Sequence, residues 1–351
     1  MEGEIKNFIL VWTTVVASLC YCHTVSKHLP KTATALRRLA ILPIAPLFWL
    51  LPLNLTSIHL GAVTSFFIAW LASFKLILFA SASGPLHSTP PLPLSLFLPL
   101  ACFPIKPQHP NTKPSPQQPS HINLPTKITI LALLIQVYTY KNHLHPKLIW
   151  CCYCIHIYFM LEILLSLAGA VARAFTRIEL EPQFNEPYLA TSLQDFWGRR
   201  WNLMVPKILH PTVYLPVRRA AARLTGSGRW AAVPAVLATF LVSGVMHELV
   251  VYNFGRVGPT GEMLGFFVLH GVSLSAEIAV KRAVPERFWV GRAVSGPATV
   301  AYVVWSSFWL FFPPFLRAGA DVKGCTESLA FVEFLKTRRL VSPAELTCPF
   351  L

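Results

Sequence analysis

Long uninterrupted runs of apolar residues constrain the fold of this chain more than any other feature. An α-helix of about 20 apolar residues is long enough to cross the hydrocarbon core of a bilayer. Runs of this kind predict about eight spans, at residues 5–25, 39–55, 58–80, 128–140, 148–172, 230–254, 263–280 and 296–316. Since 54% of the residues are hydrophobic and 13% are charged, we expect an all-α, multi-pass membrane protein, with residues 1–351 forming a single membrane-embedded domain.

Three of these runs carry a further expectation. The second contains Pro43, Pro46 and Pro52, so its helix should kink or break. The fourth is short and is expected to be tilted, re-entrant or buried, which makes it the weakest of the predicted spans. The first follows an acidic start and has no small-residue cleavage site, so we interpret it as a retained helix rather than a cleavable signal peptide.

The chain carries a formal net charge of +15, which in a soluble protein would suggest a nucleic-acid partner. Here the Lys and Arg residues lie between apolar runs, and they concentrate in every second connecting segment. The positive-inside rule then places those segments in the cytosol and both termini on the lumenal or external side. The predicted partner is therefore a lipid bilayer, and no nucleic acid is expected.

Two of the predicted cytosolic segments differ in character. Residues 84–127 are rich in proline and predict an extended, mobile loop without chemistry, of which the apolar part 92–103 is suited to lie on or dip into the membrane. Residues 173–229 form a basic segment that contains Arg and Lys but no Asp or Glu from Arg199 to Arg229. This charge suits acidic lipid headgroups, or a polyphosphate such as the nucleotide end of coenzyme A.

The eight cysteines do not predict a metal centre. Cys20 and Cys22, and the later group at residues 151, 152 and 154, stand near histidines, but they lie inside apolar helices, where a thiol behaves as a small hydrophobic side chain. No second Cys/His pair stands at the spacing of a zinc site. We therefore expect neither a metal ion nor a cofactor.

Titratable residues inside the apolar runs are candidates for function, because charge at membrane depth is costly. His247 and Glu248 lie in the run at residues 230–254. His270 and Glu277 lie seven residues apart, on one face of the next run, where they would either line a substrate entrance or bond a neighbouring helix. By themselves, such residues suit a proton relay in a transporter as well as they suit catalysis.

A second unusual stretch, Thr-Ser-Leu-Gln-Asp-Phe-Trp-Gly-Arg-Arg-Trp-Asn, occupies residues 191–202. We refer to it as the first motif. Ser192 is placed to cap a helix there, with Asp195 at the third helical position. The first motif, followed by the intramembrane Val-Met-His-Glu-Leu of residues 245–249, resembles the membrane-bound O-acyltransferase superfamily and, more closely, its plant wax synthase branch.

This resemblance implies an enzyme with its helices around an internal reaction chamber, in which residues 230–316 form a three-helix region that carries the catalytic histidine. It implies that His247 is the catalytic base and that Asn202 is the second polar residue of the site. Asn202 would orient the imidazole or donate to the developing oxyanion. The residues that we expect to contact substrate are Asp195, Trp197, Arg199, Arg200, Trp201, Glu248 and His270.

The expected reaction moves a long-chain acyl group from acyl-CoA to a long-chain fatty alcohol, giving a wax ester in the endoplasmic reticulum membrane. A hydroxyl is a poor nucleophile until a base takes its proton, whereas a thioester is already activated. Ser243 and Gly244, one turn before His247, would keep the helix face small and leave room for an acyl chain. His247 would lie roughly 25 Å below the cytosolic end of its helix, so the thioester would enter through a tunnel.

Two alternatives stay open at this stage. A sterol could replace the fatty alcohol as acceptor, because the shape of the acceptor cavity is not visible in the sequence. A lipid transporter or proton-coupled transporter would use His247, Glu248 and Glu277 differently, although the sequence shows no inverted pair of broken helices of the kind that such transporters often have.

Overall fold

The computed structural model describes residues 2–29, 32–105, 122–176, 180–226, 228 and 230–349, and every element in that part of the chain is a helix. Seven helical segments within it are long and apolar enough to cross a membrane. They are Glu2–His28, Thr34–Asn54, Ile58–Ala80, Pro146–Ala174, Ala232–Gly255, Glu262–Ala283 and Arg292–Arg317. The prediction of an all-α, multi-pass membrane protein is confirmed.

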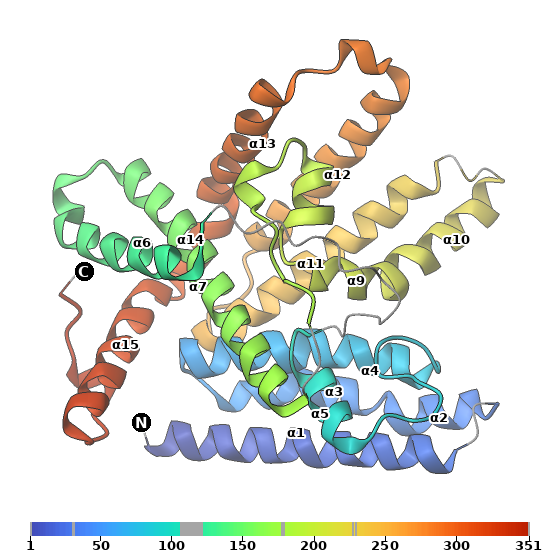
Figure 1. The fold of residues 1–351 in the computed structure, drawn as a ribbon, viewed down its shortest axis with the longest axis horizontal. Coiled ribbons are helices and arrows are strands. Elements are labelled where there is room, and N and C mark those ends of the chain that lie inside the picture. Colours follow the sequence, from blue (N-terminus) through green and yellow to red (C-terminus); the bar gives the residue numbers. More distant parts are fainter. Residues whose placement is uncertain are drawn as a thin grey trace. The chain divides into compact units, whose positions relative to one another are not determined.

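The predicted span at residues 128–140 is the one that does not reach this length. Its helix, α6 (Leu124–Val137), has 14 residues and rises about 21 Å, against about 30 Å for a bilayer core. After the short helix η4 (Tyr138–His143), the chain continues into α7 (Pro146–Thr176), which packs against α6 (Figure 1). Lys127 of α6 donates to Glu162 of α7 at 2.6 Å. The structure thus corrects the predicted count from eight spans to seven in the described residues. An odd number of spans places the two ends of the chain on opposite sides of a membrane, so the expectation that both termini are lumenal or external is corrected with it.

The chain divides into two compact units. Unit 1 contains residues 1–103, 246–261 and 313–351, and unit 2 contains residues 104–245 and 262–312. The long helix α11 (Ala232–Gly255) supplies its first part to unit 2 and its end, from Met246 onward, to unit 1. The prediction of a single domain stays a prediction.

Unit 1 is built from the N-terminal helices, the end of α11 and the C-terminal helices. Its complete helices are α1 (Glu2–His28), α2 (Thr34–Ile41), α3 (Ile44–Leu50), η1 (Leu51–Asn54), η2 (Ile58–Ala62), η3 (Ser65–Ala72), α4 (Ser73–Ala80), α5 (Leu94–Cys102), α15 (Ala320–Thr337) and η10 (Pro343–Glu345). Helices α2 and α5 both pack against α1 (Figure 1). The predicted break of the second span is confirmed, because α2, α3 and η1 divide it near Pro43 and Pro52, whereas Pro46 lies within α3.

The proline-rich segment is more ordered than its sequence predicts. Residues 106–121 lie outside the described residues, but α5 forms a regular helix within the stretch that we expected to be extended. The buried ammonium of Lys75 donates to the carbonyls of Leu100 and Phe103, at 2.6 Å each. These bonds satisfy carbonyls at the end of α5 that have no partner within the helix, and Phe97 is buried. Tertiary contacts therefore hold a helix in spite of Pro99.

The C-terminal helix α15 ties together the ends of other helices in unit 1. Lys323 donates to the carbonyl of Phe254 near the end of α11, at 2.6 Å. One turn further along, the carboxylate of Glu327 accepts hydrogen bonds from the backbone of Ile58 and His59, where the third span begins. A disulfide between Cys325 and Cys348 joins α15 to the tail that follows it, a pairing that the sequence did not predict.

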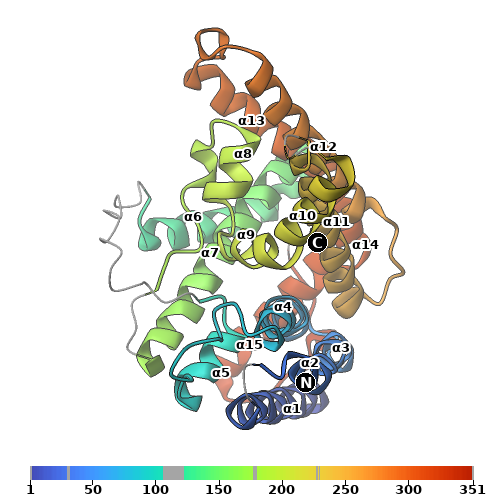
Figure 2. The ribbon, with the colours of Figure 1, turned by 90° about the vertical axis from the view of Figure 1, so that its right-hand side faces the viewer.

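Unit 2 holds the first motif. Its complete helices are α6, η4, α7, η5 (Pro187–Leu189), α8 (Leu193–Asp195), η6 (Phe196–Arg200), α9 (Met204–Leu209), η7 (His210–Tyr214), α10 (Leu215–Thr225), α12 (Glu262–Ala283), η8 (Glu286–Phe288), α13 (Arg292–Ser306) and η9 (Ser307–Phe311). Helix α14 (Phe312–Arg317) begins at the boundary with unit 1. Helix α8 lies against α12 (Figure 2), and the apolar core there includes Leu193, Phe240 and Phe267.

Candidate active site

The first motif begins with the helix cap that the sequence predicted. The hydroxyl of Ser192 accepts from the backbone N–H of Asp195 at 3.1 Å. In return, the carboxylate of Asp195 accepts from the backbone N–H of Thr191 at 3.2 Å and forms an ion pair with Arg200 at 2.7 Å. These reciprocal bonds satisfy amides that a helix start leaves without partners, so Asp195 is a fixed part of the turn.

The middle of the motif is not the regular α-helix that would bring Trp197 and Trp201 onto one face. Residues Phe196–Arg200 form a π-helical turn, and Trp201 follows in an extended conformation. Trp201 stacks on Phe196, with 5.6 Å between ring centroids and 14° between planes. Trp197 instead contacts Phe240 edge-on at 5.6 Å. The wider turn and its abrupt end separate the two indoles.

The segment before the motif braces it from the other side. The backbone N–H of Asn185 donates to the backbone carbonyl of Arg200 at 2.9 Å. The backbone N–H of Leu203 donates to the backbone carbonyl of Gln183 at 2.8 Å. The guanidinium of Arg200 donates to the carbonyls of Asn185 and Glu186 at 3.2 Å each. Arg200 therefore holds the fold of the motif through three acceptors, and its predicted contact with substrate stays a prediction.

Helix α12 anchors the motif through its two intramembrane titratable residues. The indole Nε1 of Trp197 donates to Nδ1 of His270 at 3.1 Å. Since Nδ1 accepts, Nε2 carries the proton and donates to the hydroxyl of Ser306 at 2.9 Å. Seven residues along α12, the carboxylate of Glu277 accepts from the backbone N–H of Leu193 at 2.7 Å. The sequence left two roles open for His270 and Glu277: lining a substrate entrance or bonding a neighbouring helix. The geometry shows both residues bonded to a neighbouring segment.

A polar pocket of about 450 Å³ opens between the motif, the end of α12 and the start of α13. Its lining is Thr191, Ser192, Gln194, Asp195, Arg199, Arg200, Lys281, Trp289 and Arg292. Arg200 is fixed by Asp195, and Lys281 by Glu277 at 2.7 Å. With four cations and one carboxylate in its lining, the pocket suits a ligand that carries several negative charges.

Asn202 closes the motif in an unusual conformation. Its φ angle is +38°, in the left-handed region that asparagine tolerates better than most residues. Its side-chain Oδ1 is buried, and no hydrogen-bond donor reaches it from the described residues. A buried polar atom of this kind is costly to leave unsatisfied. Asn202 therefore retains a buried acceptor for a group that the described residues do not supply.

His247 lies in the part of α11 that belongs to unit 1, and its neighbour Glu248 is half-buried. The indole of Trp70, from η3, meets the His247 imidazole edge-to-face, with 4.8 Å between ring centroids and 79° between planes. His247 belongs to unit 1 and Asn202 belongs to unit 2.

The helix face before His247 does not keep the open space that the sequence suggested. A Cβ at Gly244 would lie 2.8 Å from Leu264 Cδ1 and 2.9 Å from its Cα. The glycine therefore allows close packing of α11 on α12, and the side chain of Leu264 fills the space that we had expected an acyl chain to use.

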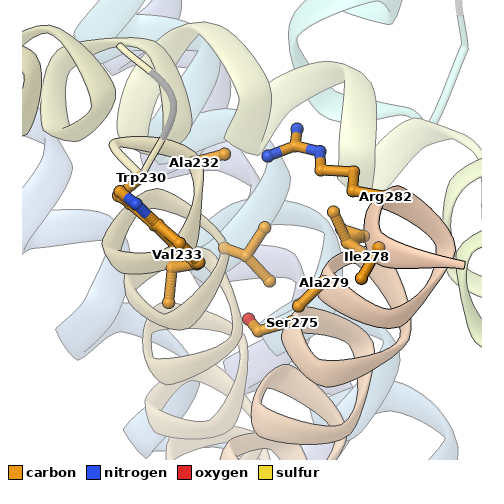
Figure 3. Close-up of a pocket in the computed structure, with 9 residues that line it drawn as sticks. Trp230, Ala232, Val233, Ser275, Ile278, Ala279 and Arg282 are labelled. Carbon is orange, nitrogen blue, oxygen red and sulfur yellow. The ribbon is translucent and has the colours of Figure 1, made fainter. Parts of the chain in front are cut away.

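A second pocket, of about 100 Å³, lies between the start of α11 and the end of α12. Figure 3 shows Trp230 and Val233 on one side, Ile278 and Ala279 on the other, and Arg282 reaching across from α12. The hydroxyl of Ser275 donates to the carbonyl of Gly271 at 2.8 Å. Apart from Ser275 and Arg282 this lining is apolar, and it contains none of the predicted catalytic residues.

Sequence reasoning missed several residues at these sites. Lys281, Trp289 and Arg292 join the polar pocket, although they follow the motif by about eighty residues or more along the chain. Trp70 lies in an apolar run whose composition gave no sign of a role. The charge of the loop at residues 281–292 was visible in the sequence, but its position beside the motif was not.

The fold and these sites define a multi-pass membrane protein with an intramembrane histidine and a basic pocket on a tryptophan-rich motif. Residues 180–269 match the model of the membrane-bound O-acyl transferase family. "Probable long-chain-alcohol O-fatty-acyltransferase 3" of Arabidopsis thaliana is 44% identical over 351 residues, covering 97% of this chain and 98% of the relative. The long-chain-alcohol O-fatty-acyltransferase of Simmondsia chinensis is 43% identical over 335 residues, covering 93% and 94%.

"Acyl-CoA--sterol O-acyltransferase 1" of Arabidopsis thaliana is 42% identical over 338 residues, covering 93% of this chain and 96% of the relative. At this identity and coverage, the chain belongs to the membrane-bound O-acyltransferase family, in the branch that contains these plant enzymes. This membership favours the acyltransferase hypothesis over the transporter alternative.

Proposed function

We propose that the protein transfers a long-chain acyl group from acyl-CoA to a long-chain fatty alcohol and forms a wax ester. The observation that carries this proposal is the similarity, over nearly the full length of both chains, to relatives named for that reaction, at 44% and 43% identity. The multi-pass fold supports it, because both the alcohol and the acyl chain of the donor dissolve in a bilayer.

His247 is the general base of the proposed reaction. Its neutral imidazole accepts the proton of the alcohol hydroxyl as the alcohol oxygen attacks the thioester carbon. A C–O bond forms, and the carbonyl becomes a tetrahedral oxyanion. When the oxyanion collapses, the C–S bond breaks, and the leaving thiolate takes the proton from the imidazolium. The products are the ester and free CoA–SH, and His247 returns to its neutral form.

Asn202 is the second polar residue of the proposed site. Its amide would orient the imidazole of His247 or donate to the oxyanion. Its side-chain oxygen is buried and has no donor among the described residues, which suits a residue that completes its hydrogen bonds only in the assembled complex with substrate.

The polar pocket is suited to the phosphates of coenzyme A. Arg199, Arg200, Lys281 and Arg292 give it an excess of positive charge, and guanidinium groups bind phosphate oxygens in a bidentate way. Trp197 and Trp201 pack within the protein, so their proposed contribution to substrate binding is to shape the motif. Donor phosphates bound in this pocket would leave the pantetheine arm to deliver the thioester to His247.

A sterol is the second candidate acceptor, because a relative that is 42% identical is named for it. The proposed location is the endoplasmic reticulum membrane. The disulfide between Cys325 and Cys348 supports a lumenal C-terminal segment, since disulfides persist in oxidising compartments.

One experiment tests the function and chooses the acceptor. The full-length protein is expressed in yeast that lacks its own neutral-lipid acyltransferases, and the cells are supplied with a fatty alcohol or a sterol. Wax esters are expected with the alcohol and are expected to disappear in His247→Ala, while the variant stays in the membrane at the wild-type level. Sterol esters alone would transfer the proposal to the second acceptor. Full ester formation by His247→Ala would remove His247 from the mechanism.

A further inference from the structure

Trp70 is the aromatic residue that contacts His247 within unit 1. The two rings meet edge-to-face at 4.8 Å, and the Trp70 side chain is 1% exposed. Trp70 also meets the ring of Phe66, one turn earlier on η3, at 5.5 Å and 80°. Its burial and these two ring contacts therefore restrict rotation of the indole away from His247.

Other contacts of unit 1 fix the two helices that carry these rings. The side-chain amide of Asn253, six residues after His247, donates to the hydroxyl of Ser65 on η3 at 2.7 Å, and both residues are fully buried. Helix α15 also contacts both helical segments near their ends. Lys323 donates to the carbonyl of Phe254, near the end of α11, and Glu327 accepts from the backbone N–H of Ile58, at the start of the third span. These hydrogen bonds fix the third span and the end of α11 at several points, and they therefore stabilise the contact between Trp70 and His247.

The indole N–H of Trp70 lacks the acceptor that comparable tryptophans have. Trp12 donates to the hydroxyl of Thr64 at 3.2 Å, and Trp49 donates to that of Ser73 at 3.3 Å. The Nε1 atom of Trp70 is buried, and none of the described residues accepts a hydrogen bond from it. A buried donor without a partner is costly, and a phenylalanine would fill much of the same space without that cost.

The backbone conformation around Trp70 is also consistent with a functional role for this residue. Residues Ser65–Ala72 form one of five π-helical segments in the described residues, and π-helical turns frequently occur at functional sites. A wide helical turn, an unsatisfied donor and a contact with the proposed base thus coincide at one residue.

We propose that Trp70 is a second catalytic residue, which donates its indole N–H to the carbonyl oxygen of the acyl thioester beside His247. The inference rests on the proposed function. His247 takes the proton of the alcohol, and the alcohol oxygen attacks the carbonyl carbon, so negative charge develops on the carbonyl oxygen. A fixed donor stabilises this charge more than it stabilises the neutral thioester, and it therefore raises kcat more than it lowers KM.

The test compares three variants in membranes from the expression strain, with kcat and both KM values measured for each. Trp70→Phe removes the N–H and keeps an aromatic ring, and its kcat is expected to fall about tenfold to a thousandfold, with each KM within about threefold of the wild type. Trp70→His, which restores a ring N–H, is expected to recover part of the lost kcat. The matched control is Trp49→Phe, which removes an indole N–H that already has a protein acceptor and should leave kcat unchanged.

The outcomes separate the inference from the function on which it rests. Wild-type kcat in Trp70→Phe would overturn the inference and leave the proposed function intact. So would a loss of activity that only follows a loss of protein from the membrane, because that result assigns Trp70 to packing. If the wild-type enzyme forms no ester, or if His247→Ala remains fully active, the proposed function itself fails.

Discussion

The indole of Trp197 donates to His270 at 3.1 Å, and this bond joins the first motif to the middle of α12. His270 is fully buried and uses both ring nitrogens, the second of them on Ser306. An intramembrane histidine thus serves the motif as an anchor, and its predicted contact with substrate stays a prediction.

Replacement of His270 by alanine is expected to destabilise the protein. The change leaves the Trp197 N–H without its acceptor and creates a cavity, and an unsatisfied buried polar group costs about 1–3 kcal/mol. Thermal unfolding in detergent should show a clearly lower Tm for His270→Ala. Trp197→Phe is the matched variant, because it removes the same hydrogen bond and keeps the ring. If both variants have the same Tm as the wild type, the hydrogen bond between Trp197 and His270 does not contribute to stability.

Glu277 is expected to govern the affinity for acyl-CoA through the shape of the motif. Its carboxylate accepts from the backbone N–H groups of Leu193 and Gln194 and pairs with Lys281. Glu277→Ala should raise the KM for acyl-CoA severalfold more than the KM for alcohol, because the polar pocket loses the fixed positions of both its motif residues and Lys281. Glu277→Gln, which keeps an acceptor, should show a smaller effect. Equal changes in both KM values would contradict this role.

Neutralising the polar pocket should weaken donor binding specifically. A hydrogen bond to a charged group is worth about 1.5–3 kcal/mol, which is about tenfold or more in affinity. Arg199→Gln with Arg292→Gln is therefore expected to raise the KM for acyl-CoA at least tenfold, with little change in the KM for alcohol. Arg218→Gln with Arg219→Gln is the control, since it removes the same charge from α10, outside the lining of the pocket. An equal effect of the two pairs would indicate general electrostatic attraction.

Gly244 should not tolerate a side chain. The Cβ of Gly244→Ala would lie 2.9 Å from the backbone Cα of Leu264, so α11 and α12 would have to move apart. Overpacking of this kind costs about 1–3 kcal/mol, and we expect a lower Tm and reduced ester formation. Gly169→Ala, in α7, is the control, because nothing lies within 4 Å of its Cβ and alanine favours a helix. A Gly244→Ala enzyme with normal Tm would show that the interface adapts.

The contacts of Glu327 predict how stability depends on pH. Burial alone would raise the pKa of this carboxyl, but hydrogen bonds from His59, Ser57 and Ile58 outweigh burial and hold the pKa below its ordinary value of 4.5. A lowered pKa in the folded state means that the carboxylate stabilises the fold above pH 4.5, and that this contribution is lost as the pH falls through the lower, folded value. The Tm of the wild type should therefore drop below pH 4.5 more steeply than that of Glu327→Gln. Parallel curves of Tm against pH for the two proteins would exclude Glu327 as the source of the pH dependence.

Much of the fold was predictable because a bilayer imposes one simple requirement on sequence. A run such as residues 58–80 must be long and apolar to cross, and a proline such as Pro43 or Pro52 favours a helix boundary because it lacks a backbone N–H. The cap at Ser192 was predictable for a similar reason, since it depends on atoms only three residues apart. The 14-residue α6 shows where this reasoning fails, because length alone was ambiguous there.

The sequence by itself determined the fold class, the acyltransferase resemblance and the residues that carry it, His247 and Asn202 among them. Only the tertiary structure showed that Leu264 fills the space at Gly244, that Lys281 and Arg292 share a pocket with Arg199, and that Trp70 lies against His247. The physical reason is the range of the interactions. Membrane insertion, helix caps and helix breaks are set by neighbouring residues, whereas pockets and buried partners depend on which distant segments pack together.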